Sequence, residues 1–383
     1  GLNERLGKLN ELLNRRLHKA ITTIPYEDWL TAHQPFHWLA EFYQIIHDNG
    51  GFDVIIGNPP YVEYTKRKLE DISQPQIVID SGNLYSAIIF RSKTILNSKS
   101  CWGMIVPISF ISTKQHQGVR RYIENGTCVY YSSYDIRPDH LFDGAAQRLT
   151  IFIVNSNSKG QHTDKQLRWY TIYRPVLFDT IVYTKPLDSS DGYFRTNGLG
   201  YSIVSKILSS EKTIITIPPL NDIWVATTAN NFIKAIDKQP RYSTNGIAKR
   251  PSGWRNLAFS SNFLLDIVSV INSSTFYYLW KSSSDGFNLT TKFILNYCPF
   301  FIKKSSEFDK LAVSLQNELE LHSESHVRNQ KTTGRTEIQL FRVKPVKPII
   351  DEIDIALAKY FCFTEEELDF IINYDIKCRM GDE

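Results

Sequence analysis

The sequence predicts an α/β core followed by an α+β domain and a helical tail, on three observations. Apolar runs of strand length alternate with segments of helical periodicity over residues 52–154, which is typical of a sheet covered by helices. Between residues 165 and 345 the apolar segments become short, irregular and rich in aromatic residues. Helical periodicity returns near residue 349. Because 383 residues exceed one ordinary compact core, we expect a core over 1–155, an α+β domain over 165–345 and a tail over 346–383.

The first part opens with leucines at helical spacing among charged residues, so residues 2–21 should form an amphipathic helix whose apolar stripe needs a partner. Residues 52–56 are predicted to be a buried strand, because they form an apolar, β-branched run that ends at Gly57. Since strands and helices alternate, we expect helices on a mostly parallel sheet. The further elements expected are helices over 84–96 and 115–124 and strands over 102–106, 129–134 and 149–154.

The second part follows a polar, linker-like stretch at residues 155–164. In the tail, residues 349–360 have the pattern of one helix. Thr364 and Glu367 then have the spacing of a capping box, which opens a second helix.

Composition describes a globular protein, with 42% hydrophobic and 22% charged residues. The longest apolar runs, such as 52–56 and 104–111, are far too short to cross a bilayer, and no basic-then-apolar leader opens the chain. We therefore expect no membrane partner and a cytoplasmic location. The histidines have no metal-ligand spacing, and no cysteine pair has C-x-x-C spacing, which argues against a metal site and suits a reducing compartment. The five cysteines are Cys101, Cys128, Cys298, Cys362 and Cys378.

Charge is unevenly distributed although the net charge is only +4. Residues 230–350 contain 17 Lys and Arg against 9 Asp and Glu, and residues 351–383 contain 3 against 10. A basic block and an acidic tail suit a domain that faces a polyanion, but ordinary surface variation gives the same counts. The candidates for phosphate and base contacts, which a solvated loop would equally explain, are Arg241, Lys249, Arg250 and Arg255, among Tyr242, Asn245 and Trp254.

The segment Gly57-Asn58-Pro59-Pro60-Tyr61 follows the predicted strand directly. Two prolines fix the backbone and remove two N–H donors, so the loop offers carbonyl oxygens, one amide and an aromatic ring. Open α/β sheets bind ligands outside the carboxyl ends of their strands. The loop therefore suits a planar ring that bears an exocyclic amine. The alternative is a proline-rich turn in which Asn58 is only a turn former.

Adenine illustrates the chemistry, because the lone pair of its N6 amine is delocalised into the ring. If the side-chain oxygen of Asn58 and the carbonyl of Pro59 each accept one N6–H bond, the nitrogen moves towards tetrahedral geometry. The lone pair is then free to attack a methyl-sulfonium in line. Tyr61 would stack on the base, which must leave the duplex to be reached.

Residues 52–61 resemble motif IV of amino-methyltransferases that act on DNA. The wider chain resembles adenine-specific methyltransferases of the type IIG restriction–modification kind, in which nuclease, methyltransferase and specificity domain share one polypeptide. The resemblance implies that residues 1–155 are the C-terminal part of a Rossmann-like catalytic domain and residues 165–345 a target-recognition domain for double-stranded DNA. The matching stretches are 35–38, 51–62, 141–154, 270–299 and 347–381.

The family places a second aromatic face against the flipped base, from a loop before a strand. Phe142 occupies that place here, so it would hold adenine against Tyr61; core packing is the alternative. The family also implies that Gly57 and Asn58 form one edge of an S-adenosylmethionine site and that Lys292 contacts DNA. The Gly-rich part of that site lies upstream of motif IV, and nothing before residue 52 resembles it. We therefore expect an upstream methyltransferase half, with or without a nuclease domain, on the same or another polypeptide.

Two other classes of function compete with this interpretation. A non-catalytic DNA specificity module would keep the basic block without using residues 57–61. A metal-dependent nuclease would use Asp375 and Lys377 as a D-x-K end, with Asp139 as the upstream acid, although Asp375 is predicted to lie in a helix.

Overall fold

The computed structural model describes residues 2–65, 74–142, 146–302, 305–330 and 334–381. The chain divides into two compact units. Unit 1 comprises residues 1–134 and 147–162, and unit 2 comprises residues 135–146 and 163–383. The tail predicted over 346–383 therefore lies in unit 2, and the functions assigned to the parts stay predictions.

Unit 1 begins with four helices, and the predicted amphipathic helix over 2–21 is confirmed as α1. Along α1, Leu9 and Leu12 remain exposed, although the helix packs against α2 and α3. Its apolar stripe is thus only partly covered by the described residues. The helices are α1 (Leu2–Ile21), α2 (Tyr26–His33), α3 (Trp38–Glu41) and α4 (Tyr43–His47).

A mixed sheet forms the centre of unit 1, with its strands in the order β1-β2-β4-β3-β5. β1 and β2 are parallel, but β4 runs antiparallel to both β2 and β3. The expectation of a mostly parallel sheet was wrong. No helix lies between β3 and β4 among residues 135–142 and 146–148, so the chain returns without the crossover that parallel strands need. The strands are β1 (Phe52–Gly57), β2 (Leu96–Pro107), β3 (Cys128–Tyr134), β4 (Leu149–Asn155) and β5 (Gly160–Leu167), which crosses the unit boundary.

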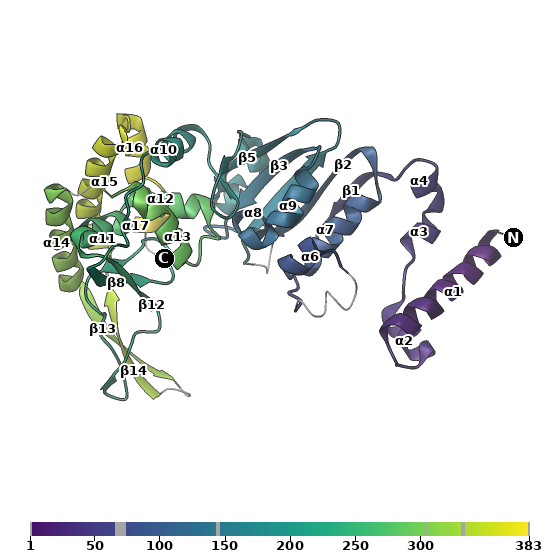
Figure 1. Ribbon diagram of the computed structural model, residues 1–383, viewed down its shortest axis with the longest axis horizontal. Helices are drawn as coiled ribbons and strands as arrows, with labels where there is room; N and C mark the ends of the chain where they lie inside the picture. Colours follow the sequence, from purple (N-terminus) through teal and green to yellow (C-terminus); the bar gives the residue numbers. More distant parts are fainter. Residues whose placement is uncertain (1, 66–73, 143–145, 303–304, 331–333, 382–383) are drawn as a thin grey trace. The chain divides into compact units, whose positions relative to one another are not determined.

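Four helices lie along one face of this sheet (Figure 1). The opposite face has an apolar groove of about 600 Å³ over β1, β2 and β4. Val54 and Ile56 line it and are 61% and 82% exposed. The prediction of a buried strand over 52–56 was therefore wrong: β1 is an edge strand, and the described residues cover only one of its faces. The helices are α6 (Gln76–Ser81), α7 (Leu84–Thr94), α8 (Ser109–Ser112) and α9 (Gln117–Glu124).

His116 is buried beneath these helices, where its Nε2 lies 2.7 Å from the hydroxyl of Tyr85. Burial, aided by the positive charge of Arg120, lowers the pKa of His116 from 6.5 to about 3. The imidazole is therefore neutral in the folded protein at physiological pH. The unfolded chain binds a proton at His116 below pH 6.5, and the folded chain does not until about pH 3.

We predict that this difference makes the protein less stable as pH falls from 6.5 towards 3. The free energy of unfolding should fall by about 1.4 kcal/mol per pH unit in this window through His116 alone. Urea unfolding of the unchanged protein and of His116→Gln at pH 8, 6.5 and 5 measures the effect. Gln keeps a hydrogen-bonding group but cannot titrate, so the free energy of unfolding of His116→Gln should depend less on pH than that of the unchanged protein. Parallel curves for the two proteins would contradict the prediction.

Unit 2 combines small antiparallel sheets with helices, as expected for an α+β part. β12 pairs with β8, which also pairs with β9. A second sheet has the order β11-β10-β14-β13, and its β13–β14 hairpin projects from the helices (Figure 1). The elements are β6 (Leu187–Asp188), β7 (Tyr193–Phe194), α10 (Gly198–Leu208), β8 (Leu220–Ala226), β9 (Ala235–Ile236), β10 (Tyr242–Thr244), β11 (Ile247–Ala248), β12 (Trp254–Ser260), α11 (Leu264–Asn272), α12 (Ser274–Ser283), α13 (Thr291–Tyr297), α14 (Ser306–Leu321), β13 (Ser323–Gln330), β14 (Gly334–Phe341), α15 (Lys347–Phe361), α16 (Glu365–Ile372) and α17 (Ile376–Met380).

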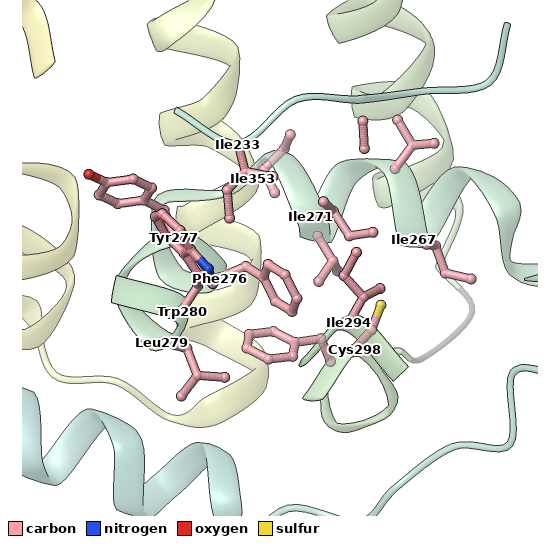
Figure 2. Packing of buried hydrophobic residues seen from close by; sticks show 14 of the residues in the cluster. Ile233, Ile267, Ile271, Phe276, Tyr277, Leu279, Trp280, Ile294, Cys298 and Ile353 are labelled. Carbon is pink, nitrogen blue, oxygen red and sulfur yellow. The ribbon is translucent and has the colours of Figure 1, made fainter. Parts of the chain in front are cut away.

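The apolar core of unit 2 is built around α12, whose ten residues are all buried. Phe276 and Trp280 of this helix pack with Ile271 and Ile294, and Ile353 from α15 joins them (Figure 2). The tail helices thus complete this core. Both predicted tail helices are found, and the capping box at α16 is formed as expected.

A group of charged side chains is buried in unit 2. The Asp135 carboxylate accepts from Arg168 Nε at 2.9 Å and lies 2.9 Å from Lys281 Nζ. Arg168 also pairs with Asp375 at 2.9 Å. The Asp135 and Lys281 side chains are 0% and 1% exposed. This ion-pair cluster (Asp135, Arg168, Lys281, Asp375) joins the chain that follows β3 to α12 and to the tail.

Two findings bear on general properties. All five cysteines are free thiols. Among the residues that the structure describes, no helix combines the length and apolar character needed to cross a membrane.

Candidate functional site

The loop predicted to carry the chemistry starts at the carboxyl end of β1, as expected. Pro59 is buried, whereas Asn58 and Pro60 are exposed. The side-chain amide of Asn58 makes no hydrogen bond with the described residues. The loop therefore presents an uncommitted amide at the sheet edge while its backbone is anchored by Pro59.

Tyr61, three residues further on, is half-buried and contacts both β2 and α7. Its hydroxyl donates to the Ile105 carbonyl of β2 at 3.1 Å. Burial raises the pKa of Tyr61 to about 12, so the phenol stays protonated and remains a donor. Its ring meets Tyr85 edge to face, with centroids 6.4 Å apart. The ring of Tyr61 is thus set in place by β2 and α7.

The residues after Tyr61 pair with the segment that leads into α7. Leu84 N donates to the Val62 carbonyl at 2.9 Å, and Tyr64 N donates to the Gly82 carbonyl at 2.8 Å. Gly82 has φ of +63°, a conformation that favours glycine. Sequence reasoning missed these anchoring residues, and the glycine before the predicted helix over 84–96 was the one local signal for them.

Phe142 is half-buried in unit 2, whereas Tyr61 belongs to unit 1. The backbone just before Phe142 is held by Arg174, whose guanidinium donates to the carbonyls of Leu141 at 2.5 Å and His140 at 3.2 Å. That Phe142 and Tyr61 hold a base between them stays a prediction. Residues 143–145, which follow Phe142, lie outside the described residues.

The predicted cofactor edge is open. A side chain at Gly57 would meet no atom within 4 Å, and Asn58 beside it is exposed. The residues before β1 form α1 to α4 and no strand–turn–helix with a Gly-rich loop. The described residues therefore fit one edge of an S-adenosylmethionine site and not the part that would hold the adenosine.

The five predicted DNA-contact residues differ in whether their side chains are already paired with other groups of the protein. Arg241 is paired with Glu320 at 2.5 Å, and Lys292 is paired with Asp191. Arg255 donates to the Leu289 carbonyl at 3.0 Å. Arg250 lies 5.5 Å from the ring centre of Trp224, and Lys249 is exposed. Lys249 and Arg250 are thus the members of the set whose side chains make no hydrogen bond or ion pair with the described residues.

The residues proposed for a nuclease are not arranged as a metal site. Asp375 is paired with Arg168, and burial raises the pKa of its carboxyl. Within the described ranges, no group of three or more His, Cys, Asp or Glu side chains could hold a metal ion. The geometry does not favour a nuclease centre here.

Comparison with known proteins supports the methyltransferase interpretation for the first part. Residues 4–136 match the Eco57I restriction-modification methylase family. A Methanocaldococcus jannaschii protein whose name describes it as a type II restriction enzyme and methyltransferase, RM.MjaORFECS2P, is 30% identical over 122 residues. That match covers 32% of this chain and 10% of the relative. This part of the chain therefore resembles restriction–modification methylases.

Solved structures give weaker matches, all of restriction–modification systems or of a DNA complex. The LlaBIII type ISP enzyme bound to DNA is 11% identical with a TM-score of 0.35, covering 76% of this chain and 33% of that one. A nuclease-deletion mutant of the type ISP enzyme LlaGI in complex with a DNA substrate mimic is 16% identical with a TM-score of 0.30, covering 46% of this chain and 18% of that one. The DrdV–DNA complex is 15% identical with a TM-score of 0.27, covering 42% of this chain and 19% of that one. TM-scores this low do not establish a shared fold. The chain spans between a tenth and a third of the length of these proteins.

Proposed function

We propose that this chain is the base-binding and DNA-reading part of a site-specific DNA adenine-N6 methyltransferase of the type IIG restriction–modification kind. The observation that carries the proposal is the loop at the end of β1, where the exposed Asn58 amide makes no hydrogen bond with the described residues and the Tyr61 ring is held by β2 and α7. The family match over residues 4–136 supports it. In this proposal unit 1 is part of a Rossmann-like catalytic core, and unit 2 contains the target-recognition domain.

In the proposed reaction the flipped adenine stacks on Tyr61, with Phe142 on its other face. The Asn58 side-chain oxygen and the Pro59 carbonyl accept the two N6–H bonds, which localises the lone pair on nitrogen. Pro60 keeps the loop rigid, since its fixed φ limits rearrangement. S-adenosylmethionine, held next to Gly57 and Asn58, would supply the methyl group: the N6–C bond would form as the C–S bond breaks, S-adenosylhomocysteine would leave, and N6 would lose one proton to solvent.

We also propose that a second, cofactor-binding half of the enzyme covers the open face of the sheet. The apolar groove over β1, β2 and β4 supports this, since exposed patches of this kind mark sites of association. In this proposal that half lies on the same or another polypeptide, with or without a nuclease domain.

The proposed function is tested by methyl transfer to duplex DNA with the completed enzyme, that is, this chain together with the proposed cofactor-binding half. Labelled methyl groups should appear in the DNA, and mass spectrometry of the nucleosides should find N6-methyladenine. Sequence-specific binding of DNA without any methylation would favour the non-catalytic specificity module instead.

The chain by itself should bind S-adenosylmethionine weakly or not at all, because the described residues offer only the Gly57 edge of its site. Isothermal calorimetry with the 383-residue chain should show no saturable heat at micromolar concentrations. The completed enzyme is the positive control. Micromolar binding by the chain alone would mean that its cofactor site is built in another way.

A further inference from the structure

A groove of about 1030 Å³ lies in unit 2. One wall comes from β13, the end of β14 and the chain that follows β14. The other wall is the connection from β8 to β9, residues 228–234. The groove is too large for one small anion and is open to solvent.

Positive charge dominates the lining of this groove. Its lining residues include five Lys or Arg and one carboxylate, Glu324. The five are Lys234, Arg328, Arg342, Lys344 and Arg379. A concave surface with such an excess attracts anions strongly, because it concentrates the field.

Three of these cations are already engaged. Arg342 and Glu324 form a two-pronged ion pair, with Nη2–Oε2 at 2.9 Å and Nε–Oε1 at 3.2 Å. Lys344 donates to the Gly381 carbonyl. Arg379 is buried and donates to the Asn231 carbonyl at 2.9 Å, so it holds the second wall in place.

Lys234 and Arg328 are different. Neither side chain has a hydrogen bond or an ion pair with the residues that the structure describes. Lys234 is half-buried, and burial lowers its pKa; an anion in the groove would offset that cost. The two cations come from different segments of the lining, Arg328 from β13 and Lys234 from the β8–β9 connection. The exposed side chains of Thr228 and Asn230 add hydrogen-bonding groups to the lining.

We propose that this groove binds the phosphodiester backbone of double-stranded DNA, with Lys234 and Arg328 each contacting a phosphate. The inference rests on the proposed function, and it places the DNA backbone on residues outside the five that the sequence singled out. Each strand of duplex DNA carries a phosphate charge about every 3.4 Å of the axis, so one strand can present phosphates to both cations. Such contacts position DNA without reading its sequence.

Fluorescence anisotropy with the full chain and a labelled DNA duplex of about 25 base pairs tests this, over a range of NaCl concentrations. Lys234→Gln and Arg328→Gln should each weaken binding about tenfold at low salt. Each should also make the slope of log K against log salt shallower by about 0.9. The control is Lys310→Gln, an exposed lysine of α14 outside the groove, which should change neither quantity.

Each outcome decides between distinct conclusions. If the two groove variants match the control while the unchanged chain binds DNA, the groove assignment is wrong and the proposed function stands. If the unchanged chain does not bind DNA, both fall. If DNA binding depends on Lys234 and Arg328 but the completed enzyme forms no N6-methyladenine, only the proposed function is contradicted. Stronger competition by an RNA duplex than by DNA would overturn the assignment to DNA. Because Arg328 is an exposed hairpin residue, its variant remains interpretable if Lys234→Gln fails to fold.

Discussion

Replacing Asn58 with alanine in the completed enzyme should reduce methyl transfer by about 100- to 1000-fold and leave DNA affinity nearly unchanged. The removal of one preorganised polar group from a reaction site has an effect of about this size. Asn58 is exposed and makes no hydrogen bond with the described residues, so its loss should not disturb the fold. DNA affinity comes mainly from phosphate contacts, which Asn58 does not make in this proposal. Single-turnover methylation and anisotropy with the same duplex measure the two quantities.

Asn58→Asp is the matched control, because it keeps an acceptor oxygen at the same place. It should retain more activity than Asn58→Ala. If binding and turnover fall together in the alanine variant, Asn58 has a structural role. If alanine and aspartate are equally inactive, the acceptor oxygen is not what the reaction uses.

The second large effect is on stability. Asp135→Asn should lower the free energy of unfolding of unit 2 by about 3–5 kcal/mol, because it leaves buried cations without their counter-charge. The Lys281 side chain is 1% exposed, and its Nζ lies 2.9 Å from the carboxylate of Asp135. Arg168 would keep its pair with Asp375. Urea unfolding followed by tryptophan fluorescence measures the loss.

The comparison for this measurement is a surface pair in the same unit. Lys359 lies 3.5 Å from Glu307, and both side chains are more than half exposed. Lys359→Gln should therefore cost less than about 1 kcal/mol. Equal effects of the two substitutions would show that the buried cluster does not stabilise unit 2 in the way its geometry indicates.

Local patterns predicted much of the secondary structure, because caps and periodicity act over a few residues. The helix over 2–21, the strand before Gly57 and the capping box of Thr364 and Glu367 are all where the sequence placed them. The loop of Asn58 follows its strand as expected. These features depend on neighbours in the chain, so a single sequence contains the information for them.

Pairing between distant segments was not predictable in the same way. Nothing local distinguishes an apolar strand that will insert antiparallel, as β4 does, from one that will pair in parallel. Asp135 and Lys281 look like ordinary surface residues in the sequence, and only the fold brings them together. Lys234 likewise has no ion pair or hydrogen bond with the described residues because of what surrounds it in the fold. Its position in the sequence does not reveal this.

The open edge of β1 has a practical consequence for handling the protein. Among the described residues β1 pairs only with β2, so its other side offers unpaired backbone groups beside the exposed Val54 and Ile56. Such an edge is a template onto which a strand of another molecule can add. Concentrated solutions of the isolated chain should be prone to aggregation through β1, and a charged substitution such as Ile56→Lys is the natural way to keep it soluble for crystallisation or binding studies.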